Sequence, residues 1–500
     1  MAVAERQPRT YGNWRKPQSA GLGQLGTLGT AILLVGFIAM IMTIMAAGIG
    51  PALAVAALFA AFLGTLVVRD RHGRSGLQRM GTALGSRHAR ATGTSLYRSG
   101  PLGRTPWGTF QLPGLAAASE LTEWQDSYGR PFALLHVPAT NHYTVVLATE
   151  PDGASLVDEE QVDSWVAHWG AWLNSLGSEP GVVSAAVTVE TAPDSGARLR
   201  REVDGNLHPD APALARAMLQ EVVTAYPEGS ASVRAWVSLT FTGTSKSGAR
   251  RKDAPEMGRE LASRLPALTH SLHATGAGAA RPVGARDLCE VVRTAYDPDA
   301  ARLIDAAHAA GEPPLLDWQN VGPGFAEAHH GHYHHENAVS VTWSMTSAPR
   351  GVVYSSVLSQ LLAPHPDVDR KRVTLLYRPF DPARSARIAE QDKRNADFKT
   401  TTSQRPSART LAAARSAAAT AEEEARGANL VNFGLLVTAT VTRPDRLPEA
   451  VAAVDNLSAT ARLMVRPVYG SQDSAFAAAL PLGLVLPTHL KVPAEIRDSL

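Results

Sequence analysis

A long stretch without ionisable residues constrains this chain more than any other feature of its sequence. Between residues 17 and 68 there is no Asp, Glu, Lys, Arg or His. Within this window, 27–46 and 51–68 are each long enough to cross the roughly 30 Å hydrocarbon layer of a bilayer. The link 47–50 is short and glycine-rich, as expected for a tight turn outside the cytoplasm. The sequence therefore predicts a transmembrane hairpin of two helices over 27–68.

The charges that flank this hairpin predict its orientation. Basic residues precede the first crossing and follow the second; they are Arg6, Arg9, Arg15, Lys16, Arg69, Arg71, Arg74, Arg79, Arg87 and Arg90. Because cytoplasmic flanks are enriched in Lys and Arg, both termini are expected in the cytoplasm of a two-pass protein of the cell membrane. A cleaved signal peptide is disfavoured by the length of the uncharged window. A buried soluble helix pair is disfavoured because neither run has a polar face.

The rest of the composition is that of a folded protein without a strong global charge. The 500 residues include 48 Lys and Arg against 46 Asp and Glu, so the net charge of +2 gives no general basis for nucleic-acid binding. The single cysteine, Cys289, excludes an internal disulfide framework and fits a reducing compartment. A buried structural role is expected for it.

Beyond the hairpin, strand-like and helix-like patterns alternate and predict an α+β cytoplasmic region made of two mixed α/β units. The second unit repeats the order of elements of the first, which raises the hypothesis of a duplication. A small local β-hairpin is expected at 97–112, and one long helical stretch at 382–426. The predicted division of the chain is a cytoplasmic tail (1–26), the transmembrane hairpin (27–68), a basic juxtamembrane connector (69–115), the first α+β unit (116–311), a Pro- and His-rich linker (312–335) and the second unit (336–500).

Motifs for nucleotide or covalent chemistry are missing from the sequence. No G-x-x-x-x-G-K-[ST] occurs, and Gly243 to Gly248 lacks the lysine after its second glycine. The glycines at 276, 278 and 284 do not follow a strand and open a helix, as a dinucleotide site requires. No serine, histidine and acid set has a nucleophile-elbow context. We therefore predict no catalytic residues, no cofactor and no enzymatic activity.

A histidine-rich segment is the strongest candidate for a metal site in the sequence. It contains His329, His330, His332, His334 and His335. Neutral imidazoles bind zinc or copper, and alternate residues of a strand share a face, so His330, His332 and His334 are candidate metal ligands. No cysteine or HExxH pattern accompanies them. A solvated loop or sheet edge is the favoured interpretation.

Two basic runs are candidate contacts for an acidic partner or for phosphate groups. The first is Arg370 to Arg372, and the second comprises Arg384, Arg387, Lys393, Arg394 and Lys399. Acidic residues are interspersed with both, among them Asp367, Asp369, Asp381, Glu390, Asp392 and Asp397. A mixed, solvated helix face is therefore the favoured interpretation.

The C-terminal half carries a resemblance. Its motifs are Tyr377-Arg-Pro-Phe-Asp-Pro382, the helix end Glu422-Glu-Glu-Ala-Arg-Gly427, the strand Asn432-Phe-Gly-Leu-Leu-Val-Thr438 and the run Gly470-Ser-Gln-Asp-Ser-Ala-Phe-Ala-Ala-Ala-Leu-Pro-Leu-Gly483. Together with the N-terminal layout they resemble the actinobacterial two-helix integral membrane proteins associated with conjugative and type IV-like secretion. The last run also resembles the end of the non-catalytic N-terminal domain of conjugation ATPases. The resemblance covers about 339–483 in motif; 69–328 matches mainly in the order of elements.

This resemblance implies a non-enzymatic, membrane-anchored structural subunit of a conjugative or type IV-like secretion apparatus. Such a subunit would dock a motor ATPase and neighbouring subunits at the inner face of the membrane and associate with itself. An EccE-like subunit of type VII secretion is the near alternative. A membrane-tethered metal enzyme that uses the 329–335 histidines is a further alternative. A DNA-handling protein in which Arg69 to Arg104 contacts phosphates is a third class, but direct nucleic-acid contact is not the expectation.

Overall fold

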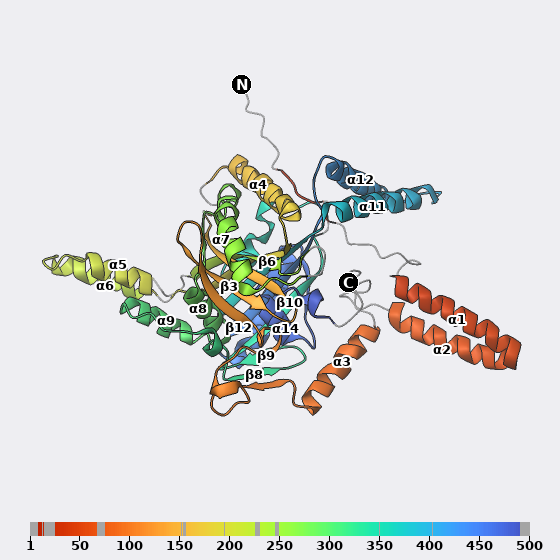
Figure 1. Cartoon of the computed structure of the whole chain (residues 1–500), viewed down its shortest axis with the longest axis horizontal. Helices are drawn as coiled ribbons and strands as arrows, with labels where there is room; N and C mark the ends of the chain where they lie inside the picture. The colour runs from red at the N-terminus through yellow and green to blue at the C-terminus, as the bar shows by residue number, and fades with distance from the viewer. Residues whose placement is uncertain are drawn as a thin grey trace, which may run out of the picture.

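The protein is described by a computed structural model that covers residues 9–12, 14, 26–67, 76–151, 153, 157–194, 196–225, 231–245, 250–349, 351–402 and 404–490. Its centre is one antiparallel sheet with helices on both faces (Figure 1). The predicted mixture of α and β structure is confirmed. Most of the basic residues that flank the predicted hairpin, including Arg69, Arg71 and Arg74, lie outside the described residues.

The described strands form a single sheet of 13 strands in the order β1-β8-β9-β10-β12-β11-β5-β6-β4-β3-β2, with β13 added beside β10 and β7 beside β4. Both α/β units contribute to this sheet, so the two predicted units share one continuous layer. The strands outside the repeated units described below are β1 (Leu96–Arg98), β2 (Glu120–Gln125), β3 (Pro131–Val137), β8 (Phe325–Ala328) and β9 (Tyr333–His335).

The first half of the sheet has a β-α-β-β-α-β order. Its elements are β4 (His142–Glu150), α4 (Glu159–Ser178), β5 (Val182–Pro193), β6 (Ala231–Thr242), α7 (Ala254–His270) and β7 (Ala279–Pro282). β4 pairs with both β6 and β7, and β6 pairs with β5, always antiparallel. The resulting spatial order, β7-β4-β6-β5, is that of a ferredoxin-like unit.

The second half repeats this arrangement element by element. Its elements are β10 (Ala338–Ser347), α10 (Ser359–Leu362), β11 (Arg370–Pro379), β12 (Val431–Val441), α13 (Leu447–Thr460) and β13 (Met464–Pro467). The spatial order is β13-β10-β12-β11. The repeated topology supports the hypothesis of a duplication with structural evidence that the residues alone do not provide.

The two halves meet where β5 pairs antiparallel with β11, a junction we call the seam. Its register runs from Thr191 opposite Lys371 to Ala185 opposite Tyr377. Each half also carries a helical hairpin inserted between its second and third strands along the chain. The first is α5 (Ala197–Asn206) with α6 (Ala213–Ala225), and the second is α11 (Pro382–Thr402) with α12 (Ala408–Ala425).

Three hydrophobic clusters hold the layers together. On one face, α4 and α7 pack on the first half through residues such as Trp172 and Leu261, while α13 packs on the second half through Val454. On the opposite face, α8 (Ala285–Tyr296) and α14 (Gln472–Ala478) share a cluster with strands of both halves, including Val146 of β4. This third cluster therefore spans the sheet. Helix α9 (Ala300–Ala309) follows α8 along the chain.

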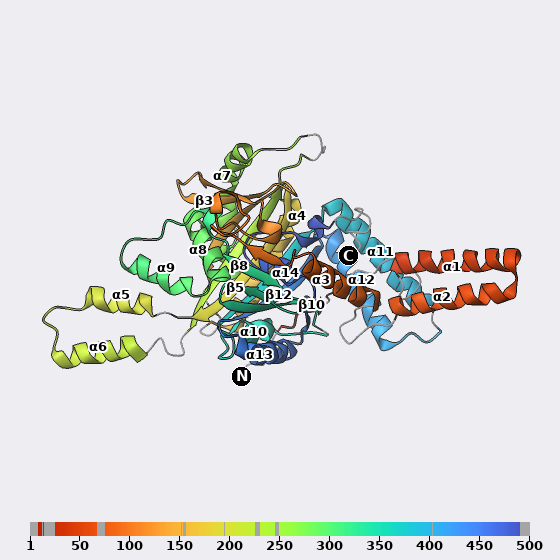
Figure 2. The same cartoon turned by 90° about the horizontal axis from the view of Figure 1, so that it is seen from below.

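Two apolar helices, α1 (Gly26–Ala47) and α2 (Ile49–Val67), project side by side away from the sheet (Figure 2). Gly36 allows their close approach, because a Cβ there would lie 2.5 Å from the ring of Phe59. Among the described residues, one helix segment, Thr30–Ala47, is long and apolar enough to cross a membrane, and almost none of it is buried in the protein. α2 contributes a shorter apolar segment, Ile49–Gly64.

Several local expectations are wrong. The predicted linker 312–335 contains β8 and β9, so its C-terminal part belongs to the sheet. β1 pairs with β8, more than 200 residues away, in place of the local hairpin expected at 97–112. The predicted connector also contains the helix α3 (Gly76–Ala91). The helical stretch 382–426 is two helices, because the chain turns back after α11 to form α12.

Candidate interaction surfaces

The seam contains a buried cluster of charges. Glu190 of β5 lies opposite Arg372 of β11 and is 5% exposed. Nη1 of Arg370 donates to its Oε1 at 2.5 Å, and Nη2 of Arg372 donates to its Oε2 at 2.8 Å. The prediction of a solvated helix face for Arg370 to Arg372 is therefore wrong, because these residues lie in a central strand whose acidic partner is 180 residues away.

The electrostatics of this cluster favour the charged state of the acid. Burial raises the pKa of Glu190, but the attraction of Arg370 and Arg372 and their hydrogen bonds outweigh it and lower the pKa to about 2. Lys371 points to the other face of β11, where it donates to the carbonyl oxygen of Ala363. Burial lowers its pKa to about 8. The basic run is thus structural, with Arg370 and Arg372 sharing the single carboxylate of Glu190 within the sheet.

Residues 472–485, which we call the closing segment, lie across the sheet and contact both halves. The Thr240 hydroxyl of the first half donates to the Gly483 carbonyl at 3.0 Å. The Thr374 hydroxyl of the second half donates to the Ala479 carbonyl at 2.7 Å. Gln472 is fully buried, and its Oε1 accepts from the backbone N–H of Thr342 at 2.8 Å.

The closing segment requires glycine where it crosses the first half. Gly483 has a φ of 63°, and a Cβ there would lie 2.2 Å from Oγ1 of Thr240 and 2.5 Å from Oγ1 of Thr144. Phe476 of the same segment is fully buried and lies under the guanidinium of Arg372 at 5.5 Å. The run that carries the resemblance to conjugation ATPases therefore packs in the core, and its side chains are not an exposed docking face.

The histidines of 329–335 do not converge. His329 stacks on His332 with ring centroids 4.4 Å apart, while His330 stacks on Tyr469 and His334 meets the edge of Phe325. Within the described ranges, no group of three or more His, Cys, Asp or Glu residues is arranged to hold a metal ion. The candidate ligands His330, His332 and His334 thus have separate packing environments.

His335 is the buried member of this segment. One ring nitrogen lies 2.6 Å from the carbonyl oxygen of Tyr296, and the other lies 2.8 Å from the Ser340 hydroxyl. The carbonyl only accepts, so the nitrogen facing it carries the proton and the Ser340 hydroxyl donates to the other. Burial lowers the pKa of His335 to about 4, which keeps the ring neutral. This histidine is a structural residue of the sheet.

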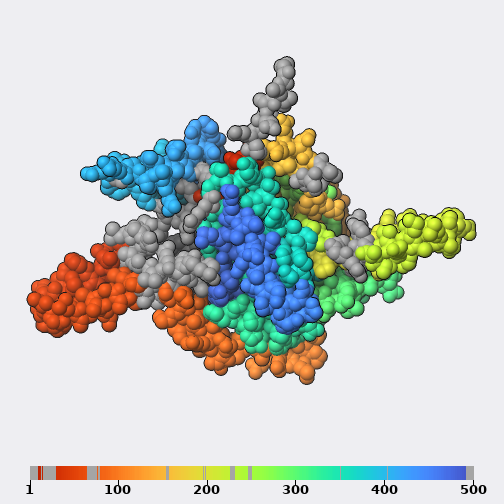
Figure 3. Space-filling model, turned by 180° about the vertical axis from the view of Figure 1, so that it is seen from behind, coloured from red at the N-terminus to blue at the C-terminus, as the bar shows by residue number. Residues whose placement is uncertain are grey.

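The helical hairpins offer the most accessible surfaces. In the view from behind, α5 and α6 project on one side of the sheet, whereas α11 and α12 project on the other side, where α1 and α2 also lie (Figure 3). On α6, Leu214, Met218 and Val222 follow one another at intervals of four residues and are 73%, 60% and 47% exposed. This spacing places them on one face of the helix, which we call the α6 stripe.

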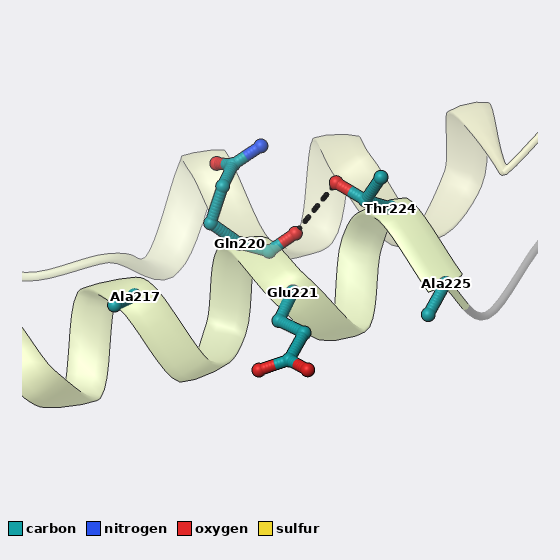
Figure 4. A pocket seen from close by; sticks show the side chains of 5 residues that line it. All are labelled: Ala217, Gln220, Glu221, Thr224 and Ala225. Carbon is teal, nitrogen blue, oxygen red and sulfur yellow. Dashed lines mark hydrogen bonds between the residues drawn. The ribbon is translucent and has the colours of Figure 1, made fainter.

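An open surface hollow lies beside the α6 stripe on the same helix. It is lined by Ala217, Gln220, Glu221, Thr224 and Ala225 (Figure 4). The Thr224 hydroxyl donates to the backbone carbonyl of Gln220 within the helix. All five lining residues belong to a single helix. A hollow of this kind suits contact with another protein surface better than the enclosure of a small ligand.

The second hairpin has a different surface. Phe398 of α11 and Leu411 of α12 are 70% and 44% exposed. The basic residues of the second run, Arg384, Arg387, Lys393, Arg394 and Lys399, all lie on α11 and are exposed. The prediction of a solvated, charged helix face is confirmed for α11.

The remaining residues singled out from the sequence, Cys289 and the glycine-rich loops, lie in different parts of the structure. Cys289 is buried in α8, as expected, and burial raises the pKa of its thiol to about 12. The loop that begins at Gly243 lies partly outside the described residues, at 246–249. Gly276 and Gly278 precede the short strand β7, whereas Gly284 follows β7 and is the N-cap of α8. The expectation that these glycines do not follow a strand and open a helix is therefore wrong for Gly284, because β7 is only four residues long and gives little sequence pattern.

Comparison with known proteins gives one family. Residues 18–78 match a domain of unknown function (DUF8461), a span that includes α1, α2 and the start of α3. The comparison with curated proteins found no match. The family match therefore concerns the N-terminal apolar region and does not extend over the sheet.

The α6 stripe was not predicted, although the residue spacing that indicates it is present in the sequence. Leu214, Met218 and Val222 give the four-residue spacing of a helix face. The same spacing is usual for a helix packed on a core. Only the projection of α5 and α6 away from the sheet distinguishes an exposed stripe from a buried one.

Proposed function

We propose that this chain is a non-enzymatic, membrane-anchored structural subunit of a conjugative or type IV-like secretion apparatus. In this role it docks a motor ATPase and neighbouring subunits at the inner face of the membrane. One observation carries the proposal. A single sheet presents two exposed helical hairpins, and the same chain has an apolar helix long enough to span a membrane.

The architecture supports a scaffold because the sheet is continuous across both halves and the hairpins are exposed. The seam and the closing segment join the two halves through buried polar contacts. The α6 stripe is apolar and α11 is charged, so the two hairpins suit different partners. Self-association is part of the proposal, since one chain with two dissimilar arms can bind another copy as well as the ATPase.

The membrane topology in this proposal has two crossings, by α1 and α2, with both termini in the cytoplasm. The close packing of Gly36 on Phe59 and the uncharged sequence of both helices support it. The exposed apolar side chains along α2, such as Leu53 and Leu58, suit contact with lipid.

Photo-crosslinking from the native membrane tests the partner assignment. A photoreactive amino acid is placed at Met218 on the α6 stripe or at Phe398 on α11. Tyr128, which lies in the turn between β2 and β3 and is at least as exposed as both, is the control position. We expect a secretion ATPase or a neighbouring subunit to be captured from Met218 or Phe398 and not from Tyr128.

The captured partners, identified by mass spectrometry, distinguish the machines. Type VII components would favour the EccE-like alternative over a type IV-like system. Recovery of this chain without any secretion subunit from all three positions would contradict the proposal.

A further inference from the structure

The helix α3 follows α2 after a short segment and carries an outward-facing apolar surface. Met80 and Leu84 are four residues apart on one face of α3, and they are 55% and 54% exposed. Exposed apolar side chains of this size on a helix next to a membrane span need a nonaqueous neighbour to be favourable.

The opposite face of α3 rests on the protein. Thr82, Ser86 and Ala89 are half-buried. A Cβ at Gly470, in the turn before α14, would lie 3.2 Å from the carbonyl oxygen of Thr82. The small side chains therefore face the sheet domain, and the larger apolar ones are turned away from it. An ordinary surface helix has the reverse arrangement, with its apolar face inward.

The charges on α3 are all of one sign. Arg79, Arg87 and Arg90 are exposed and are separated by eight and three residues, which places them on one side of the helix, beside the apolar face. The sequence has no Asp or Glu from residue 71 to residue 119. A surface that combines exposed apolar groups with uncompensated arginines is complementary to an anionic bilayer.

The position of α3 fits the plane of a membrane surface. It lies next to the inner end of the α1–α2 pair and runs across the direction of those helices (Figure 1). We propose that α3 is an interfacial helix that binds the anionic lipid surface of the inner leaflet through Met80, Leu84 and its three arginines. The inference rests on the proposed membrane anchoring.

This contact gives α3 a mechanical role. The same helix packs on the turn at Gly470, whose N–H donates to the carbonyl of His330 at 2.8 Å. Lipid binding by α3 therefore fixes the sheet domain, and with it both hairpins, relative to the membrane plane. A flexible tether alone would leave that orientation free.

Lipid-borne quenching of a site-specific fluorophore tests the proposal on the full-length chain in nanodiscs. Because Cys289 is buried, a thiol-reactive dye attaches selectively to an introduced cysteine. The positions are Met80→Cys and Leu84→Cys on the apolar face, Ile38→Cys in α1 as the membrane reference and Tyr128→Cys as the remote control. Discs contain phosphatidylcholine alone, or phosphatidylcholine with one third phosphatidylglycerol, together with a quencher attached to the lipid tails.

We expect quenching at residues 80 and 84 that is strongest with phosphatidylglycerol, and none at residue 128. The triple change Arg79→Gln, Arg87→Gln and Arg90→Gln should abolish the phosphatidylglycerol effect, because each arginine strengthens association by roughly fivefold and the three together by on the order of 100-fold.

Three results would overturn the proposal, and they differ in their meaning for the anchor. Quenching at residue 38 without quenching at residues 80 and 84 refutes the interfacial helix and leaves the anchor intact. Absence of quenching at all positions refutes both. Protection of residues 80 and 84 from aqueous iodide without lipid quenching would assign the face to a protein partner and also reject the proposal.

Discussion

Replacing Glu190 by glutamine should destabilise the sheet at the seam. The change keeps the size of the side chain but leaves Arg370 and Arg372 buried without their counter-charge. The lowered pKa of Glu190 gives the expected loss of folding free energy. A fall from an ordinary value of 4.5 to about 2 corresponds to about 3 kcal/mol of stability at neutral pH. This agrees with the roughly 3–5 kcal/mol lost when one partner of a buried ion pair is removed.

The assay is urea unfolding of the full-length chain in a mild detergent, followed by the circular dichroism of its sheet. Glu179→Gln is the matched control, because Glu179 pairs with Arg264 nearer the surface, where both side chains are partly exposed. An exposed pair contributes about 1 kcal/mol or less. A clear loss is therefore expected for Glu190→Gln, with little change for Glu179→Gln.

The pH dependence provides a second observable. A carboxylate whose pKa is lowered by folding stabilises the protein above its unfolded pKa, and this contribution is lost as the pH falls through the folded value. Glu190 should therefore contribute fully at neutral pH and lose its effect between about pH 4.5 and 2. The wild type and Glu190→Gln should converge in stability over that window.

Replacing all three charged residues of the seam tests whether uncompensated buried charge causes the destabilisation. Changing Glu190, Arg370 and Arg372 together to Leu, Met and Met removes the uncompensated charges and should recover much of the stability lost by Glu190→Gln. Equal unfolding midpoints for Glu190→Gln and Glu179→Gln would refute the assignment of the seam as an energetically important ion cluster.

Two further changes test the closing segment and the buried histidine. Gly483→Ala should lower the thermal midpoint of unfolding, because the added Cβ would overlap Oγ1 of Thr240. Gly129→Ala is the control, since Gly129 has a similar positive φ of 76° and open space around it. Equal losses in the two variants would contradict the packing argument. His335, whose pKa is lowered to about 4 by burial, should make the protein less stable as the pH falls from 6.5 towards 4, by up to roughly 1.4 kcal/mol per pH unit in urea unfolding. His335→Gln should reduce this slope, and an unchanged slope in His335→Gln would refute the assignment of the pH dependence to His335.

The sequence predicted most of the strands because their patterns are local. The run 143–148 lies within β4, and the run 232–242 lies within β6. In both, β-branched and aromatic residues are concentrated enough to indicate a strand. The strands β8 and β9 were not predicted because they are short and have Gly and His around them. Their stability comes from pairing with neighbouring strands, which local sequence patterns do not show.

The merger of two units into one sheet could not be predicted from local patterns. It depends on the pairing of β5 with β11, which are far apart in the sequence. The run Arg370 to Arg372 illustrates the difficulty, since three consecutive basic residues normally indicate a solvated surface. Only the position of Glu190 on the neighbouring strand makes their burial favourable.

The distribution of charge across the seam also determines what the two halves can pair with. The acid comes from β5 and both arginines come from β11. If two molecules exchanged or doubled these strands symmetrically, β5 against β5 would bring buried carboxylates together, and β11 against β11 would bring buried guanidinium groups together. Either arrangement would leave like charges uncompensated in a dry environment. The charges at the seam therefore disfavour pairing of identical strands between molecules, although the two halves have the same topology.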